Sequence, residues 1–138
     1  MEEFEIIRAV VEDEQTLCEM FLKHIDAHPE YISHGEIQMG VGEGEFVDGV
    51  LVARPSARAK ECWMRYIHAD MTSDDAAVFK AVRPTGEIIG FTVAEIQEDG
   101  ADPFGMICDL LVKEGCRCGG VGTALMENAL AWLRSRGV

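Results

Sequence analysis

Residues 110–125 read LLVKEGCRCGGVGTAL and join an apolar run to a helical one through a turn that contains four glycines. The first amides of a helix have no partner within the helix and carry partial positive charge. Glycine lets the backbone approach an anion closely, and Arg117 adds a guanidinium group suited to phosphate. This stretch therefore predicts a turn that cradles a pyrophosphate where a helix begins.

Other phosphate-binding loops match this turn poorly. A dinucleotide fingerprint has Gly120 and Gly122, but Leu125 stands where its third glycine or alanine belongs. A Walker A loop needs lysine before its serine or threonine, and here Thr123 directly follows Gly122. The pattern that fits is Arg-x-x-Gly-x-Gly, from Arg117 to Gly122.

The apolar spacing elsewhere predicts further strands and helices. Asp13 is expected to cap the first helix and Pro55 to open the second. Residues 34–50 carry five glycines and no clean period, which predicts a loop with short elements at most. The expected strands are 5–10, 74–82, 87–97 and 104–112, and the expected helices are 13–27, 57–67 and 120–136. The near-continuous apolar run 104–112 favours a position at the centre of the sheet.

With these neighbours the turn resembles the central motif of the GCN5-related N-acetyltransferase (GNAT) family. That motif is Gln/Arg-x-x-Gly-x-Gly/Ala between the fourth strand and the next helix. The resemblance covers residues 5–138 and is clearest from about residue 75. It implies one α/β domain over residues 1–138, with a mixed, mostly antiparallel central sheet and helices on both faces.

The resemblance also implies acetyl-CoA as the acetyl donor. Leu111 and Val112, at the end of the fourth strand, would hydrogen-bond the pantetheine arm through their backbones. Arg117 would add its charge beside the pyrophosphate. The backbone amides expected to bind the pyrophosphate belong to Cys118, Gly119, Gly120, Val121, Gly122 and Thr123.

The chemistry of such a family is direct transfer of the acetyl group to a primary amine of a small molecule or peptide. The amine must be neutral when it attacks, and the departing thiolate needs a proton. Asp109 on the fourth strand is the first acidic candidate and Glu95 on the third is the second, because an acid in an apolar strand is costly unless paired or used. A structural pairing role is an equal alternative for each.

The printed sequence ends at Val138, where relatives in the family continue. There a fifth strand, a helix that commonly supplies a tyrosine as general acid, and two more strands follow. The resemblance thus implies a C-terminally incomplete fold whose fourth strand is an open apolar edge. Two explanations stay open: the chain is a fragment of a longer enzyme, or a second copy covers the edge as a homodimer.

The charge composition limits the kinds of partner that the protein can bind. The net charge is −13, and thirteen of the first fifty residues are acidic against two basic ones. Such a surface repels nucleic acid, and it either attracts a cationic amine or simply keeps the protein in solution. There is no apolar run that could span a membrane and no apolar signal segment at the N-terminus, so a cytoplasmic protein is expected.

Metal chemistry is not expected. The pairs Cys116/Cys118 and His24/His28 each lack further ligands nearby in the sequence. Two other function classes stay open beside the acetyltransferase. One is a CoA-binding or interaction module that has lost catalysis, and the other is a structural fragment without a ligand. Acetyl transfer to any amine would distinguish the acetyltransferase from these two classes.

Overall fold

The computed structural model of the chain describes residues 3–100, 102–116 and 119–138. It divides into two compact units. One unit combines the N-terminal segment up to Val11 with the chain from Ala69 onward, and the other runs from Glu12 to His68. The elements, in chain order, are β1 (Glu5–Arg8), η1 (Val11–Asp13), α1 (Glu14–Ala27), η2 (Pro29–Tyr31), α2 (His34–Gln38), β2 (Gly42–Val47), β3 (Val50–Pro55), α3 (Ala59–Thr72), β4 (Ala76–Val82), β5 (Ile88–Gln97), β6 (Phe104–Val112) and α4 (Val121–Ser135).

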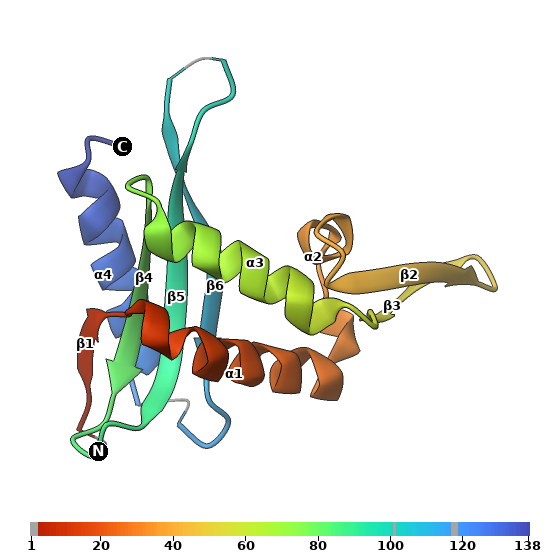
Figure 1. Cartoon of the computed structure of the whole chain (residues 1–138), viewed down its shortest axis with the longest axis horizontal. Coiled ribbons are helices and arrows are strands. Elements are labelled where there is room, and N and C mark those ends of the chain that lie inside the picture. Colours follow the sequence, from red (N-terminus) through yellow and green to blue (C-terminus); the bar gives the residue numbers. More distant parts are fainter. Residues whose placement is uncertain (1–2, 101, 117–118) are drawn as a thin grey trace. The chain divides into compact units, whose positions relative to one another are not determined.

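The first unit is built on a four-stranded sheet with the order β1-β4-β5-β6, antiparallel at every pairing (Figure 1). The predicted strands and the α/β class are confirmed. The central position predicted for residues 104–112 is wrong, because β6 lies at the edge and pairs with β5 alone among the described residues. An apolar run does not indicate the position of a strand in the sheet, since an edge strand and a central strand can have similar sequences.

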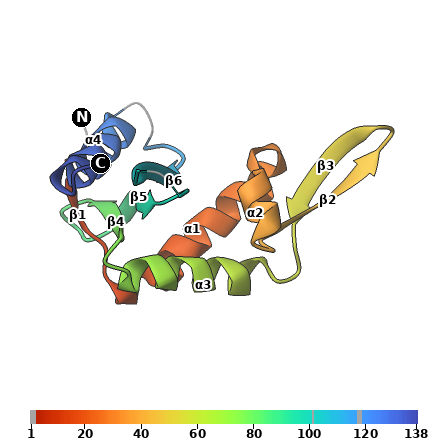
Figure 2. The ribbon, with the colours of Figure 1, turned by 90° about the horizontal axis from the view of Figure 1, so that it is seen from above.

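Helix α4 packs on one face of this sheet (Figure 2). Its buried residues Leu125, Ala129 and Leu133 follow the predicted helical spacing. The contact is close because glycines face the helix. A Cβ atom on Gly90 would lie 3.1 Å from Cδ1 of Leu125, and one on Gly105 would lie 2.7 Å from Cδ1 of Leu133. Burial of this face is what fixes the register of β5 and β6.

The second unit centres on α1 and the first part of α3. The rings of Phe21 and Trp63 stack with centroids 5.1 Å apart, and Trp63 is fully buried. Helix α1 ends at Ala27 before Pro29, as predicted. Asp13 occupies the N-cap position of α1, as predicted. Its backbone is already helical and its side chain accepts no capping hydrogen bond, because a short 3-10 turn leads into the helix.

The segment predicted as a loop is a short helix followed by the hairpin β2–β3, which extends away from α1 and α2 (Figures 1 and 2). Asp48 and Gly49 both have positive φ and form its tight turn. Pro55 ends β3, and α3 starts only at Ala59, so the helix start predicted at Pro55 is wrong. Proline fits there because the end of a strand in a two-stranded sheet can lack an amide donor.

No helix among the described residues is long and apolar enough to cross a lipid bilayer.

Candidate functional site

The described residues of the turn between β6 and α4 are 113–116 and 119–120. The Lys113 amide donates to the Ile89 carbonyl at 2.8 Å, which ties the end of β6 to β5. Gly120 adopts a left-handed conformation with φ +82°, and a Cβ atom added there would meet no atom of the described residues within 4 Å. Helix α4 begins at the next residue, Val121. The amides of its first turn have no acceptor within the helix, so this surface suits an anion.

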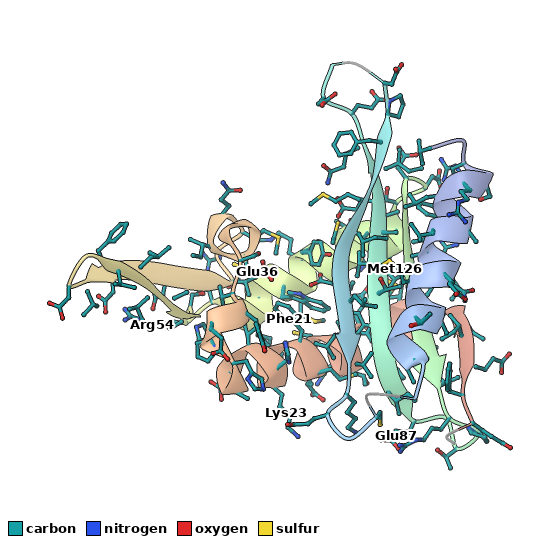
Figure 3. All side chains as sticks on the ribbon, turned by 180° about the vertical axis from the view of Figure 1, so that it is seen from behind. Phe21, Lys23, Glu36, Arg54, Glu87 and Met126 are labelled. Carbon is teal, nitrogen blue, oxygen red and sulfur yellow. The ribbon has the colours of Figure 1, made fainter. Side chains whose placement is uncertain are left out.

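Glu87, labelled in Figure 3, joins two ion pairs at the same end of the sheet. Glu87 accepts hydrogen bonds from Lys113 at 2.9 Å and from Arg83 at 2.6 Å. These two bonds, the one from Lys113 first, lower the pKa of the Glu87 carboxyl. Arg83 also donates to Sγ of Cys116 at 3.2 Å. The network links the turn before β5 to the turn after β6, where the glycine turn starts.

Acidic side chains gather on the sheet face opposite α4. Ala94 packs in the core under α4, and because side chains alternate along a strand, its neighbour Glu95 points the other way. Asp109 on β6 pairs with Val93, which shares the face of Glu95. The register of β5 and β6 shifts between these positions, which leaves Cys108 as the extra residue of a bulge. Bulges re-aim side chains next to functional sites.

Hydrogen bonds within this group converge on Glu95. Gln97 donates from Nε2 to Oε1 of Glu95 at 2.7 Å, and side chains of Asp70 and Cys108 also bond to it. Burial of Glu95 would raise its pKa, but these bonds outweigh burial and lower it. The Cys108 thiol is neutral, since burial and then the nearby Glu95 charge raise its pKa. The result is a carboxylate held by several donors on a partly buried sheet face.

A comparison with protein-family models places the sequence. The model described as the acetyltransferase (GNAT) family matches residues 46–138, more than half of the 138 residues. The chain belongs to the GNAT family. The match includes β4, β5, β6, the glycine turn and α4, so the strands that carry Glu95 and Asp109 lie within the family's domain.

Solved structures give this GNAT chain the same fold at low sequence identity. A GNAT-family acetyltransferase from Staphylococcus aureus Mu50 is 11% identical with a TM-score of 0.67, over 99% of this chain and 69% of that one. An aminoglycoside acetyltransferase from an uncultured soil metagenomic sample, solved with sisomicin, is 15% identical with a TM-score of 0.59, over 97% and 72%. AAC(6′)-Iy, solved with the bisubstrate analogue CoA-S-monomethyl-acetylneamine, is 16% identical with a TM-score of 0.64, over 99% and 75%. A search of curated proteins finds no match to the sequence.

The residues predicted to bind the acetyl donor lie on one continuous stretch of the chain. Leu111 is buried and Val112 half-buried at the end of β6. The predicted residues of the turn that are described are Gly119, Gly120, Val121, Gly122 and Thr123, all at the start of α4. Arg117 and Cys118 lie outside the described residues, so their predicted roles stay predictions.

The two predicted acids, Glu95 and Asp109, come together on one face of the sheet, on adjacent strands. Sequence reasoning did not find Asp70, in the last turn of α3, or the contribution of Cys108. Asp70 follows a helical pattern without any motif, so only the fold reveals its contact with Glu95. Among the described residues, no group of three or more His, Cys, Asp or Glu side chains is arranged to hold a metal ion.

Proposed function

We propose that this GNAT chain transfers an acetyl group from acetyl-CoA to a primary amine of a small molecule or peptide. The main support for the proposal is that β6 connects the acidic sheet face at Asp109 with the strand end at Val112. Asp109 lies three residues before Val112, and strand residues rise about 3.4 Å each, so the acidic face lies roughly 10 Å from the strand end that leads into the glycine turn. A thioester on an extended arm can span that separation.

The donor would bind at both ends of this path. Backbone amides from Gly119 to Thr123, with Arg117 and Cys118, would hold its pyrophosphate. Among the described residues β6 pairs with β5 alone, so its other edge can face the pantetheine arm, which Leu111 and Val112 would bind through their backbones. Gly120 has positive φ and stands directly before α4, which agrees with this assignment.

Glu95 is our candidate base, because the hydrogen bonds of the acidic face converge on it. The amine nitrogen attacks the thioester carbonyl carbon, a carbon–nitrogen bond forms and the carbon–sulfur bond breaks. The amine proton passes to Glu95, and the thiolate of CoA leaves with its electron pair and takes a proton from water. Asp109 adds negative charge beside the attacking amine, which favours a cationic acceptor.

The acceptor class is inferred from charge. The chain carries net charge −13. Among the charged residues of its first fifty positions, thirteen are acidic and two are basic. Structural neighbours include enzymes that act on aminoglycosides and on glucosamine. We infer a cationic primary amine, and acceptor binding should then weaken as salt concentration rises.

A transfer assay tests the proposal. Acetyl-CoA is incubated with sisomicin, glucosamine, a polyamine and an anionic amino acid, and release of the free CoA thiol is followed with a chromogenic disulfide. We expect turnover with at least one cationic amine, at a rate above that of buffer. If donor binding is measurable but no amine is acetylated, the enzyme assignment is wrong. Turnover confined to neutral or anionic amines would remove the cationic preference.

The open edge of β6 supports a second copy as a partner. Phe104, Met106 and Leu110 are between 40% and 45% exposed along this strand, and an unpaired apolar edge favours association. We infer a homodimer that covers the edge from Phe104 to Leu110 and leaves Leu111 and Val112 to the donor. Light scattering at high concentration should give twice the mass of the chain, and a monomer under those conditions would contradict this inference.

A further inference from the structure

Asp70 contacts the proposed base from a third element. It lies in the last turn of α3, within the same compact unit as β5 and β6, and its side chain is hydrogen-bonded to Glu95. An ionised carboxylate has acceptors only, so a bond between two carboxyl groups requires a proton on one of them. The pair therefore shares a single proton and carries one negative charge.

Burial shows which partner keeps the proton. Oδ2 of Asp70 is buried and has no hydrogen-bond partner in the described part of the chain. A charge on that oxygen would be uncompensated, whereas the neutral acid costs much less to bury. Glu95 instead accepts bonds from Gln97 and Cys108, which stabilise its ionised form. The proton consequently belongs to Asp70 and the charge to Glu95.

We propose that Asp70 is a positioning residue for acetyl transfer: its carboxyl group keeps a proton, donates it to Glu95, and so holds the Glu95 carboxylate in the orientation that accepts the proton of the amine. This role rests on the proposed function of Glu95. The groups that face Asp70 from neighbouring elements are Glu95 on β5 and Asp109 on β6, with Cys108 beside them.

The electrostatics of the face agree with this assignment. Burial raises the pKa of Asp70 most, and the bond to Glu95 and the charges of Glu95 and Asp109 raise it further, to about 8. A carboxyl group whose pKa is raised by folding favours the folded state below its unfolded value of about 4. That contribution is lost as pH rises towards the folded value. The free energy of unfolding of wild type should therefore fall as pH rises from about 4 to about 8.

An Asp70→Asn variant tests proton retention without any turnover. Asparagine keeps the shape and a donor for Glu95 but cannot ionise. The melting temperature of the variant minus that of wild type should rise by about 5 °C or more between pH 5 and pH 8.5. Asp74→Asn, the same change at an exposed position four residues on, should show no such rise. A flat difference for Asp70→Asn overturns the proposal.

A second comparison tests whether the proton depends on Glu95. In a Glu95→Gln background the carboxylate partner is gone, and the rise produced by Asp70→Asn should become smaller. An unchanged rise would show that Asp70 keeps its proton through burial alone, which contradicts a pair that acts as a unit.

The transfer assay reports on positioning itself. With sisomicin or glucosamine as acceptor, Asp70→Asn should keep kcat within about threefold of wild type at pH 7, whereas Asp70→Ala should lower kcat about tenfold with little change in KM. The ratio of Asp70→Asn to wild type should increase above pH 8, and taking the ratio cancels the ionisation of the amine. Equal kcat for Asp70→Ala and wild type overturns positioning. Absence of turnover in wild type overturns the proposed function instead, and the melting-temperature difference still reports on the shared proton.

Discussion

The β5–β6–α4 region and the β2–β3 hairpin use similar residues to different ends. Both contain glycines and apolar strand residues. In the first, a Cβ atom added to Gly90 or Gly105 would lie within 2.9 Å of a backbone or helix side-chain atom. In the second, Phe46 is 77% exposed at the tip, and Gly49 has open space around it. The structural role of a glycine or an apolar residue depends on which element packs against it.

The two regions also differ in what stabilises them. The hairpin depends on local features, namely its tight turn and the bonds from Arg54 to Glu43 and Glu45 at 2.9 and 3.0 Å. A two-stranded hairpin is only marginally stable alone in water. The sheet region instead buries a continuous face under α4. We therefore expect substitutions in the sheet region to affect activity and stability strongly, and those in the hairpin to affect them weakly.

The largest expected effect is on activity. Glu95→Gln keeps the shape of the side chain but removes the proposed base, so kcat/KM should fall by about 100-fold or more. Steady-state transfer with acetyl-CoA measures it. Glu98→Gln, the same change at an exposed position just after β5, serves as the control and should retain wild-type rates. Retention of activity by Glu95→Gln would move the base elsewhere, with Asp109 as the next candidate.

A matched pair of leucine truncations tests the difference in packing. Leu125 is fully buried under the sheet, whereas Leu51 in the hairpin is 43% exposed. Leu125→Ala should lower the free energy of unfolding by about 3 kcal/mol, and Leu51→Ala by less than about 1 kcal/mol. Urea denaturation followed by circular dichroism gives both values. Similar losses for the two variants would mean that the hairpin is packed in solution.

Glycine-to-alanine changes sharpen the comparison at a smaller scale. Gly90→Ala places a methyl group 2.9 Å from a backbone oxygen, which cannot move aside, and should cost about 1–3 kcal/mol. The closest contact of Gly44→Ala is the end of the Leu51 side chain at 3.0 Å, which can rotate away, and its other contacts lie at 3.6 Å or more. Its melting temperature should stay close to that of wild type. Thermal unfolding of both variants decides, and a greater loss for Gly44→Ala would contradict the account.

The smallest effect is expected for the hairpin ion pairs. Arg54 and its two glutamates are each more than half exposed, so water and salt screen their attraction. Arg54→Gln should leave the melting temperature unchanged within the error of calorimetry at physiological salt. A clear drop would show that these pairs hold the hairpin together.

The sequence predicts the sheet region well because long-range packing there leaves local traces. Alternating and helical apolar spacing marks β4, β5, β6 and α4, and the glycine pattern marks the turn. The hairpin strands bury little and have no such apolar spacing, and the local signal they do have, Asp48-Gly49 between apolar residues, was not used in the prediction of a loop. Asp70 was missed for a related reason, because its partner Glu95 is distant in the chain and neither residue belongs to a motif. The edge position of β6 also depends on pairing that an apolar run cannot encode.

Donor binding at the glycine turn is the central claim, and calorimetry with acetyl-CoA tests it most directly. Gly120 and Gly49 both have positive φ and open space, so Gly→Glu at the two positions is a matched change. Wild type and Gly49→Glu should bind acetyl-CoA alike, whereas Gly120→Glu puts a negative charge where the pyrophosphate should lie and should weaken binding roughly 30-fold or more. Equal affinity of wild type and Gly120→Glu would contradict the assignment of the turn.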